Sequence, residues 1–182
     1  MNLTERYEKA LTFAARTHGD HCRKGTAIPY LSHLLHASAI VMENGGDEDE
    51  CIAALLHDVI EDRPEVHGGE EATMREIESR WGKRVLKIVR EVTNTDELPK
   101  PKWADTSLSG KRVSLADRLA NLRSILMELR TAGPVLWEKF SHGRDETLRK
   151  YRGNIDQLRK SDPGPLVEEM HFVLLEIERL SR

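Results

Sequence analysis

The sequence has few of the features that mark secreted, membrane-spanning or fibrous proteins. Its only cysteines, Cys22 and Cys51, do not form a CxxC pair, so disulfide stapling is not expected. No apolar run approaches the length of a membrane-spanning helix, and residues 1–19 lack the apolar core of a signal peptide. These absences together favour a protein of the reducing cytoplasm.

The charge and composition also exclude some classes of partner. The formal net charge is −3, so the chain has no basic excess that would favour non-specific binding to nucleic acid. Aromatic residues make up only 5% of the chain, and Leu, Ala, Ile and Val supply most of its apolar content, as is typical of a helical, well-solvated globule. We therefore expect neither nucleic acid nor a membrane as a partner. A local basic patch could still bind a small anionic ligand, and the oligomeric state stays open.

Helical periodicity covers most of the chain, with no internal repeat, low-complexity tract or alternating strand pattern. A third helix is expected to begin at its cap, Asp47, and to continue through Ile60. Loops are predicted at 19–29, 63–69 and 94–110. The other predicted helices are 4–18, 30–44, 70–80, 83–93, 111–131 and 135–181, the last of them broken at 162–165. The expected fold class is all-α, a single helical bundle domain over residues 1–182.

A dense group of ionisable side chains follows the apolar run Ala54-Leu55-Leu56. In a continuous helix, His57 and Glu61 share one face, and Asp58 and Asp62 share the neighbouring face. Burying several carboxylates beside an apolar run is unfavourable without a cation, and a divalent metal supplies one. The alternative is that the helix reaches the surface at residue 57 and water solvates these groups. For an isolated His-Asp pair, that alternative would be the better interpretation.

Two other segments shift the balance toward a metal site. His33 lies in the mostly apolar first turn of one predicted helix, and Asp117 lies inside another apolar helix. Aspartate has poor helix propensity, so an internal one usually needs a partner. Taken alone, His33 would be a core histidine, and Asp117 would pair with Arg118 or Arg123 or lie on an exposed helix face. Together with the His57-Asp58 pair, they are harder to explain without a shared ligand.

The order H…HD…D, with HDxxED after AALL and LADRLxNLR downstream, resembles the HD superfamily of metal phosphohydrolases. The closer resemblance is to the hydrolase domain of the RelA/SpoT group and its small stand-alone relatives. Those enzymes remove the 3′-pyrophosphate from guanosine tetraphosphate and pentaphosphate, (p)ppGpp. The resemblance covers about residues 4–160, and the combined pattern is specific although each piece is weak. Its other parts are ALTFAARTH at 10–18, RKGT at 23–26, Pro29-Tyr30, Gly45-Gly46, WGKRV at 81–85 and EVT at 91–93.

The resemblance implies an HD-type phosphohydrolase domain that acts on a small phosphorylated nucleotide with one divalent metal ion, manganese being the expected one. The implied metal ligands are His33, His57, Asp58 and Asp117. Glu61 and Asp62 match the pair that orients and activates the attacking water.

The resemblance also implies contacts to the substrate. Arg23 and Lys24 match a basic loop that contacts the nucleotide through guanidinium and ammonium groups. Without the resemblance, a solvated loop charge would be the better interpretation of both. Arg118 and Asn121 belong to the LADRLxN signature, and the resemblance gives them a supporting or ligand-contacting role.

The chain departs from the family pattern in ways that keep three functional hypotheses open. Ser114 stands where many members have lysine, Ala120 stands where they have an aromatic residue or histidine, and the connection from Thr93 to Val113 lacks the charged helix that borders their substrate cleft. The first hypothesis is a (p)ppGpp 3′-pyrophosphohydrolase. The second is a phosphohydrolase that acts on another nucleotide or a phosphorylated cofactor. The third is a non-catalytic nucleotide-binding protein that keeps the HD fold.

Overall fold

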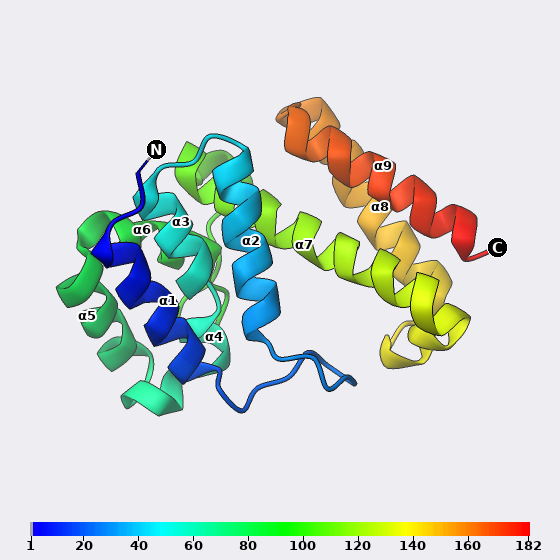
Figure 1. The fold of residues 1–182 in the computed structure, drawn as a ribbon. Coiled ribbons are helices and arrows are strands. Elements are labelled where there is room, and N and C mark those ends of the chain that lie inside the picture. The colour runs from blue at the N-terminus through cyan, green and yellow to red at the C-terminus, as the bar shows by residue number, and fades with distance from the viewer. Residues whose placement is uncertain (1) are drawn as a thin grey trace. The chain divides into compact units, whose positions relative to one another are not determined.

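A computed structural model describes residues 2–182, and over this range the chain is helical with no strand, which confirms the expected fold class (Figure 1). None of the helices in the described range combines the length and apolar character needed to cross a membrane. Short 3-10 helices form at Pro64–His67, Trp103–Asp105 and Gly133–Lys139. The α-helices are α1 Glu5–Thr17, α2 Leu31–Glu43, α3 Glu48–Leu56, α4 Val59–Asp62, α5 Glu70–Trp81, α6 Lys83–Val92, α7 Leu108–Ala132, α8 Gly143–Ser161 and α9 Pro165–Leu180.

The chain divides into two compact units within α7. The first unit ends at Asp117, and the second comprises Arg118–Arg182. Each unit is described by itself below. The expectation of one domain over 1–182 stays a prediction.

Helix α3 forms the centre of the first unit, where it packs against α1, α2 and α6 (Figure 1). Its residues from Cys51 to Leu56 are all fully buried. A helix that is apolar on every side is stable only when neighbouring elements cover it completely. Because α3 is fixed in the core of the unit, it also fixes the position of His57, which directly follows its last residue.

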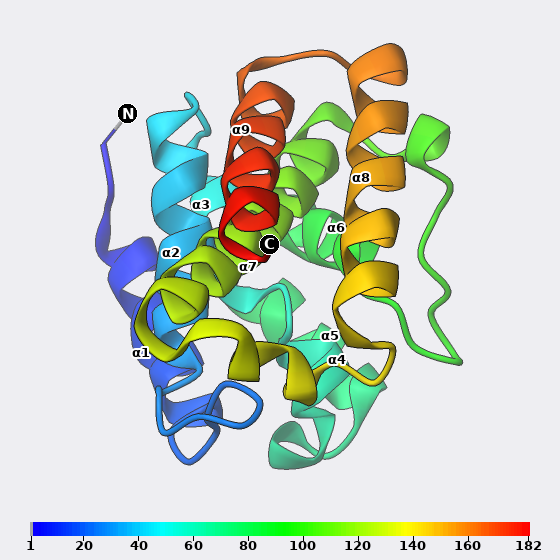
Figure 2. The same ribbon diagram turned by 90° about the vertical axis from the view of Figure 1, so that its right-hand side faces the viewer.

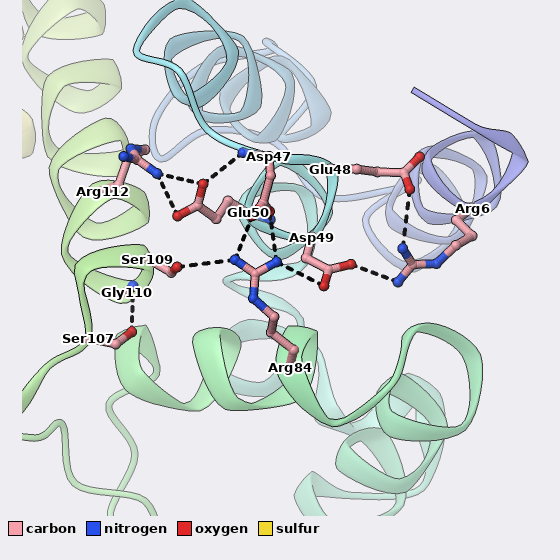
Figure 3. Close-up of polar contacts among 10 residues, drawn as sticks. All are labelled: Arg6, Asp47, Glu48, Asp49, Glu50, Arg84, Ser107, Ser109, Gly110 and Arg112. Carbon is pink, nitrogen blue, oxygen red and sulfur yellow. Dashed lines mark hydrogen bonds and ion pairs between the residues drawn. The ribbon is translucent and has the colours of Figure 1, made fainter. Parts of the chain in front are cut away.

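Ion pairs and a capping box hold the N-terminal end of α3 (Figure 3). The Asp47 side chain accepts the backbone N–H of Glu50, and the Glu50 carboxylate accepts the N–H of Asp47 at 2.8 Å. Arg84 of α6 contacts Asp47 at 2.6 Å, and Arg112 of α7 contacts the buried Glu50 at 2.6 Å. Arg6 of α1 pairs with Asp49 at 2.8 Å. Three helices are thus fixed to the start of α3.

The predicted third helix is interrupted, and this corrects the expectation of a continuous helical face from His57 to Asp62. Helix α3 ends at Leu56 and α4 begins at Val59. The His57 ring donates its Nδ1–H to the carbonyl of Ala54 at 2.8 Å, and a continuing helix would offer that carbonyl to the amide of residue 58. Asp58 has φ −98° and ψ −1°, close to the sparsely populated bridge region.

Other boundaries differ from the predicted ones by small amounts. Helix α7 begins at Leu108, inside the predicted loop 94–110, because the Ser107 hydroxyl accepts the N–H of Gly110 at 3.1 Å and caps the helix. The predicted helix 135–181 begins instead with the 3-10 helix Gly133–Lys139 and α8. Its predicted break at 162–165 is confirmed between α8 and α9.

In the second unit, α8 and α9 form an antiparallel pair (Figures 1 and 2). Ile155 of α8 and Met170 of α9 are each 1% exposed, so the pair has an apolar interior. Arg159 and Glu168 join the two helices near the turn at 2.8 Å. Arg123 of α7 reaches Glu169 of α9 at 3.2 Å, which ties the second half of α7 to this pair.

Candidate metal and active site

Two buried histidines from different helices face one another in the first unit. His33 lies in the first turn of α2 and His57 directly follows α3, and their side chains are 2% and 4% exposed. Their Nε2 atoms are 3.3 Å apart. Because the carbonyl of Ala54 can only accept, Nδ1 of His57 carries a proton, and Nε2 is the ring nitrogen that faces His33.

Two carboxylates complete this group. Asp58 places Oδ2 at 2.9 Å from Nε2 of His57 and at 3.6 Å from Nε2 of His33. Asp117 places Oδ1 at 3.2 Å from Nε2 of His33 and at 3.6 Å from Nε2 of His57. All four predicted ligand residues therefore converge, and Asp117 faces imidazoles at close range. We call His33, His57, Asp58 and Asp117 the HD cluster.

The electrostatics of the HD cluster match the chemistry of a cation site. Burial opposes ionisation of Asp58, yet the adjacent imidazoles of His57 and His33 outweigh it and hold the pKa of Asp58 well below its usual range. Burial likewise opposes ionisation of Asp117, and the same two imidazoles hold its pKa low. Burial would lower the pKa of His57, but the charge of Asp58 and contact with Asp117 raise it well above its usual value. Positive charge is thus strongly favoured among these atoms.

The donor set also fits one divalent ion. Ligand atoms of His33, His57 and Asp58 all lie within 4.8 Å of one another, so a single ion could reach all three. Imidazole nitrogens and carboxylate oxygens are the usual protein ligands of zinc, manganese and iron. The HD cluster is therefore a group that could hold a divalent metal.

The predicted catalytic carboxylates lie on α4, directly after the HD cluster. Glu61 accepts the backbone N–H of Asn94 at 3.0 Å, which connects α4 to the segment after α6. Partial burial and the charges of Asp58 and Asp62 raise the pKa of Glu61. Partial burial and the charge of Asp58 also raise the pKa of Asp62. Carboxylates with raised pKa values are better proton acceptors, as the predicted role requires.

The basic loop has a defined conformation next to the HD cluster. The N–H of Arg23 donates to the carbonyl of Ile28 at 2.9 Å, and the N–H of Tyr30 donates to the carbonyl of His21 at 2.8 Å. The guanidinium carbon of Arg23 lies 5.5 Å from the centre of the Tyr30 ring. Tyr30 in turn donates its hydroxyl to Asp58, so the loop that carries Arg23 is joined to the cluster.

The other predicted substrate residues stay predictions. Lys24 is exposed on the basic loop. Arg118 and Asn121 lie on the next turn of α7 and belong to the second unit. Their contact with a nucleotide is therefore an inference from the sequence alone.

Two residues at the site were not assigned a role from the sequence. Tyr30 stands three residues before His33, and this closeness in the sequence to a predicted metal ligand could have indicated a role at the site. Asn94 contacts Glu61 through its backbone N–H. Any residue except proline could make this contact, so the sequence could not predict it. Between α6 and α7, the described chain contains the 3-10 turn Trp103–Asp105 and no α-helix, as the sequence predicted.

Comparison with known proteins assigns the family. The profile of the HD domain family matches residues 10–111, which is more than half of the chain. The chain therefore belongs to the HD domain family, whose members carry a divalent metal site at the His-Asp motif.

Among the relatives, guanosine-3′,5′-bis(diphosphate) 3′-pyrophosphohydrolase MESH1 of Xenopus tropicalis is 35% identical over 161 residues, which cover 80% of this chain and 84% of that protein. The guanosine-3′,5′-bis(diphosphate) 3′-pyrophosphohydrolase of Aquifex aeolicus (strain VF5) is 34% identical over 125 residues, which cover 69% of this chain but 16% of that longer protein. A solved structure of a metazoan orthologue of SpoT that hydrolyses ppGpp has 26% identity and a TM-score of 0.68, over 100% of this chain and 99% of that one.

Proposed function

We propose that this chain is a metal-dependent phosphohydrolase that removes the 3′-pyrophosphate from guanosine tetraphosphate or pentaphosphate. The observation that carries the proposal is the convergence of His33, His57, Asp58 and Asp117 beside the carboxylates of α4. Relatives named as guanosine-3′,5′-bis(diphosphate) 3′-pyrophosphohydrolases support the choice of substrate. The proposed location is the reducing cytoplasm predicted from the sequence.

The four residues of the HD cluster would hold the ion, and manganese is the proposed metal because mixed nitrogen and oxygen ligands suit it. A bound divalent ion supplies charge that polarises a phosphate oxygen and lowers the pKa of a water molecule. The chain itself fixes the donors. The carbonyl of Ala54 sets the orientation of the His57 ring, and both histidine side chains are buried.

Glu61 is the proposed acceptor of the proton from the attacking water, because its raised pKa increases its basicity and the N–H of Asn94 fixes its position. Asp62 is proposed to orient the same water. Arg23 and Lys24 would bind the base and phosphates of the nucleotide, with Arg118 and Asn121 in supporting contacts.

A second function is favoured by the segment between α6 and α7. It lacks an α-helix in the described chain, and the buried Ser114 stands where the family resemblance implies lysine in many members. These features would leave the substrate cleft more open and remove one phosphate contact, so another nucleotide or a phosphorylated cofactor is the alternative substrate. Retention of all six proposed metal and catalytic residues argues against the third hypothesis, a non-catalytic nucleotide-binding protein.

The test is release of pyrophosphate from guanosine tetraphosphate by the purified, manganese-loaded chain, with Asp58→Ala as the control. We expect release by the natural chain and neither metal content nor release in the variant, because a direct ligand is lost. A folded, metal-loaded chain that releases no pyrophosphate over a wide substrate range would contradict the proposed substrate. A panel of other nucleotides and phosphorylated cofactors would then test the alternative.

A further inference from the structure

Tyr30 lies between the basic loop and the HD cluster. It immediately precedes α2, which carries His33, and its side chain is partly buried. The hydroxyl donates to Oδ2 of Asp58 at 2.6 Å. This distance is typical of a strong hydrogen bond between a hydroxyl and a carboxylate.

The oxygen that Tyr30 contacts is the one that faces the imidazoles. Oδ2 of Asp58 is also the atom 2.9 Å from Nε2 of His57 and 3.6 Å from Nε2 of His33. The hydroxyl therefore fixes which carboxylate oxygen points into the HD cluster, and at what angle. Hydrogen bonds of this kind orient the ligands of protein metal sites and tune their affinity.

Neighbouring rings fix the orientation of the phenol. The Tyr30 ring stacks on His21 with centroids 4.2 Å apart and an interplanar angle of 7°, and it lies 5.0 Å from His18 at 14°. It meets His33 edge to face at 5.5 Å. A ring held in this way directs its hydroxyl along one line, because rotation would break the stacking.

The same ring supports the basic loop. The guanidinium carbon of Arg23 lies 5.5 Å from the centre of the Tyr30 ring, within the range of a cation–π interaction. One side chain thus contacts a proposed metal ligand through its hydroxyl and a proposed substrate residue through its ring.

We infer that Tyr30 is a positioning residue with two separable parts: its hydroxyl orients Asp58 for the metal ion, and its ring orients Arg23 for the nucleotide. The inference rests on the proposed function. A merely structural tyrosine would stabilise the fold without changing metal affinity or substrate binding once the chain is folded. The two parts can be removed one at a time.

Tyr30→Phe removes the hydroxyl and keeps the ring. We expect its affinity for Mn²⁺ to fall by about 10- to 100-fold, the usual cost of losing a contact to a metal ligand. Calorimetric titration of Mn²⁺ into the metal-stripped full chain measures this without turnover. At saturating Mn²⁺, KM for guanosine tetraphosphate should stay within about twofold, because the ring still supports Arg23.

Tyr30→Leu removes the ring as well. It should lose metal affinity to the same extent and also raise KM, by about as much as Arg23→Ala raises it. If Tyr30→Leu does not fold, the combination of Tyr30→Phe with Arg23→Ala tests the separation, since the two effects should then be independent.

Tyr7→Phe is the matched control. The Tyr7 hydroxyl contacts the Ser38 hydroxyl at 2.9 Å in the same unit and makes no contact with the HD cluster, so its loss should leave Mn²⁺ affinity and KM unchanged. Circular dichroism and thermal unfolding verify that all variants are folded.

The outcomes separate this inference from the proposed function. If the natural chain binds no Mn²⁺, the proposed metal site fails and the role of Tyr30 fails with it. If the natural chain binds Mn²⁺ and Tyr30→Phe binds it equally well, the proposed function stands and the inference about the hydroxyl is overturned. If KM of folded Tyr30→Leu matches that of Tyr30→Phe, the inference about the ring is overturned.

Discussion

At the scale of single residues, Glu61 has a carboxylate whose ionisation is disfavoured by partial burial and by nearby negative charge. Glu61→Gln keeps the size of the side chain and an oxygen that can accept the N–H of Asn94, but it cannot take a proton from water. We expect Mn²⁺ affinity to change little and kcat to fall by about 10²- to 10⁴-fold, the usual contribution of a general base. Metal titration and pyrophosphate release measure the two effects separately.

The control for this change is Glu65→Gln. Glu65 lies in the next turn of chain, is well exposed and pairs with Arg63 at 2.9 Å, so its loss should leave kcat unchanged. Full kcat in Glu61→Gln would mean that another group takes the proton.

The residues of the HD cluster also show what a sequence can predict about a site. His33, His57, Asp58 and Asp117 could be chosen because ionisable groups inside apolar helical runs need a shared partner, and the motif order resembled a known family. Which oxygen of Asp58 faces the imidazoles could not be predicted, since Tyr30 determines it through a contact across 28 positions of the chain.

At the scale of elements, His57 and Asp58 directly follow α3, Asp117 lies on α7, and Arg112 joins these two helices. Its guanidinium lies 2.6 Å from both carboxylate oxygens of Glu50, whose side chain is 4% exposed (Figure 3). Arg112→Ala leaves that carboxylate buried without a cation. We expect the free energy of unfolding to fall by about 2–3 kcal/mol, less than for a fully buried pair because the Arg112 side chain is 33% exposed. Urea denaturation monitored by circular dichroism measures it.

Arg84 provides the comparison within the same group of ion pairs. It contacts Asp47 at 2.6 Å and Asp49 at 3.0 Å, but its side chain is 50% exposed. Exposed pairs contribute about 0.2–1 kcal/mol, so Arg84→Ala should cost far less than Arg112→Ala. Equal losses in the two variants would mean that the burial of Glu50 does not determine the strength of the contact.

The elements themselves were largely predictable, because long amphipathic runs and glycine or proline breaks define most helix boundaries. The exceptions have local causes. At the interruption between α3 and α4 the His57 ring donates to the carbonyl of Ala54, and apolar periodicity does not detect one side-chain bond. The early start of α7 depends on the cap by Ser107, inside a polar segment that otherwise reads as a loop.

At the scale of the whole molecule, the HD cluster links stability to pH and to metal. Burial alone would lower the pKa of His57, but Asp58 and Asp117 raise it. The folded chain therefore holds the His57 proton more tightly than the unfolded chain does. This stabilises the fold fully at pH values below the unfolded pKa of about 6.5, and the stabilisation is lost as pH rises through the pKa of the folded chain. The lowered pKa values of Asp58 and Asp117 stabilise the fold above about pH 3.9, and that stabilisation is lost as pH falls through the folded values. The HD cluster therefore stabilises the metal-free fold most between about pH 4 and 6.5.

A divalent ion should replace the proton held by the HD cluster, so metal binding should release protons and tighten as pH rises from 6 to 8. At Mn²⁺ concentrations about 100 times Kd, the folded state gains about 2.7 kcal/mol, which for a chain of this size raises Tm by about 5–10 °C. Differential scanning calorimetry with and without Mn²⁺ at pH 6 and pH 8 measures the rise in Tm and its dependence on pH. Removal of the ion with a chelator should return Tm to the metal-free value. Asp58→Ala should show no Mn²⁺ shift at either pH. A shift as large in that variant as in the natural chain would place the metal elsewhere, and a shift that decreases from pH 6 to 8 would contradict the exchange of a proton for the ion.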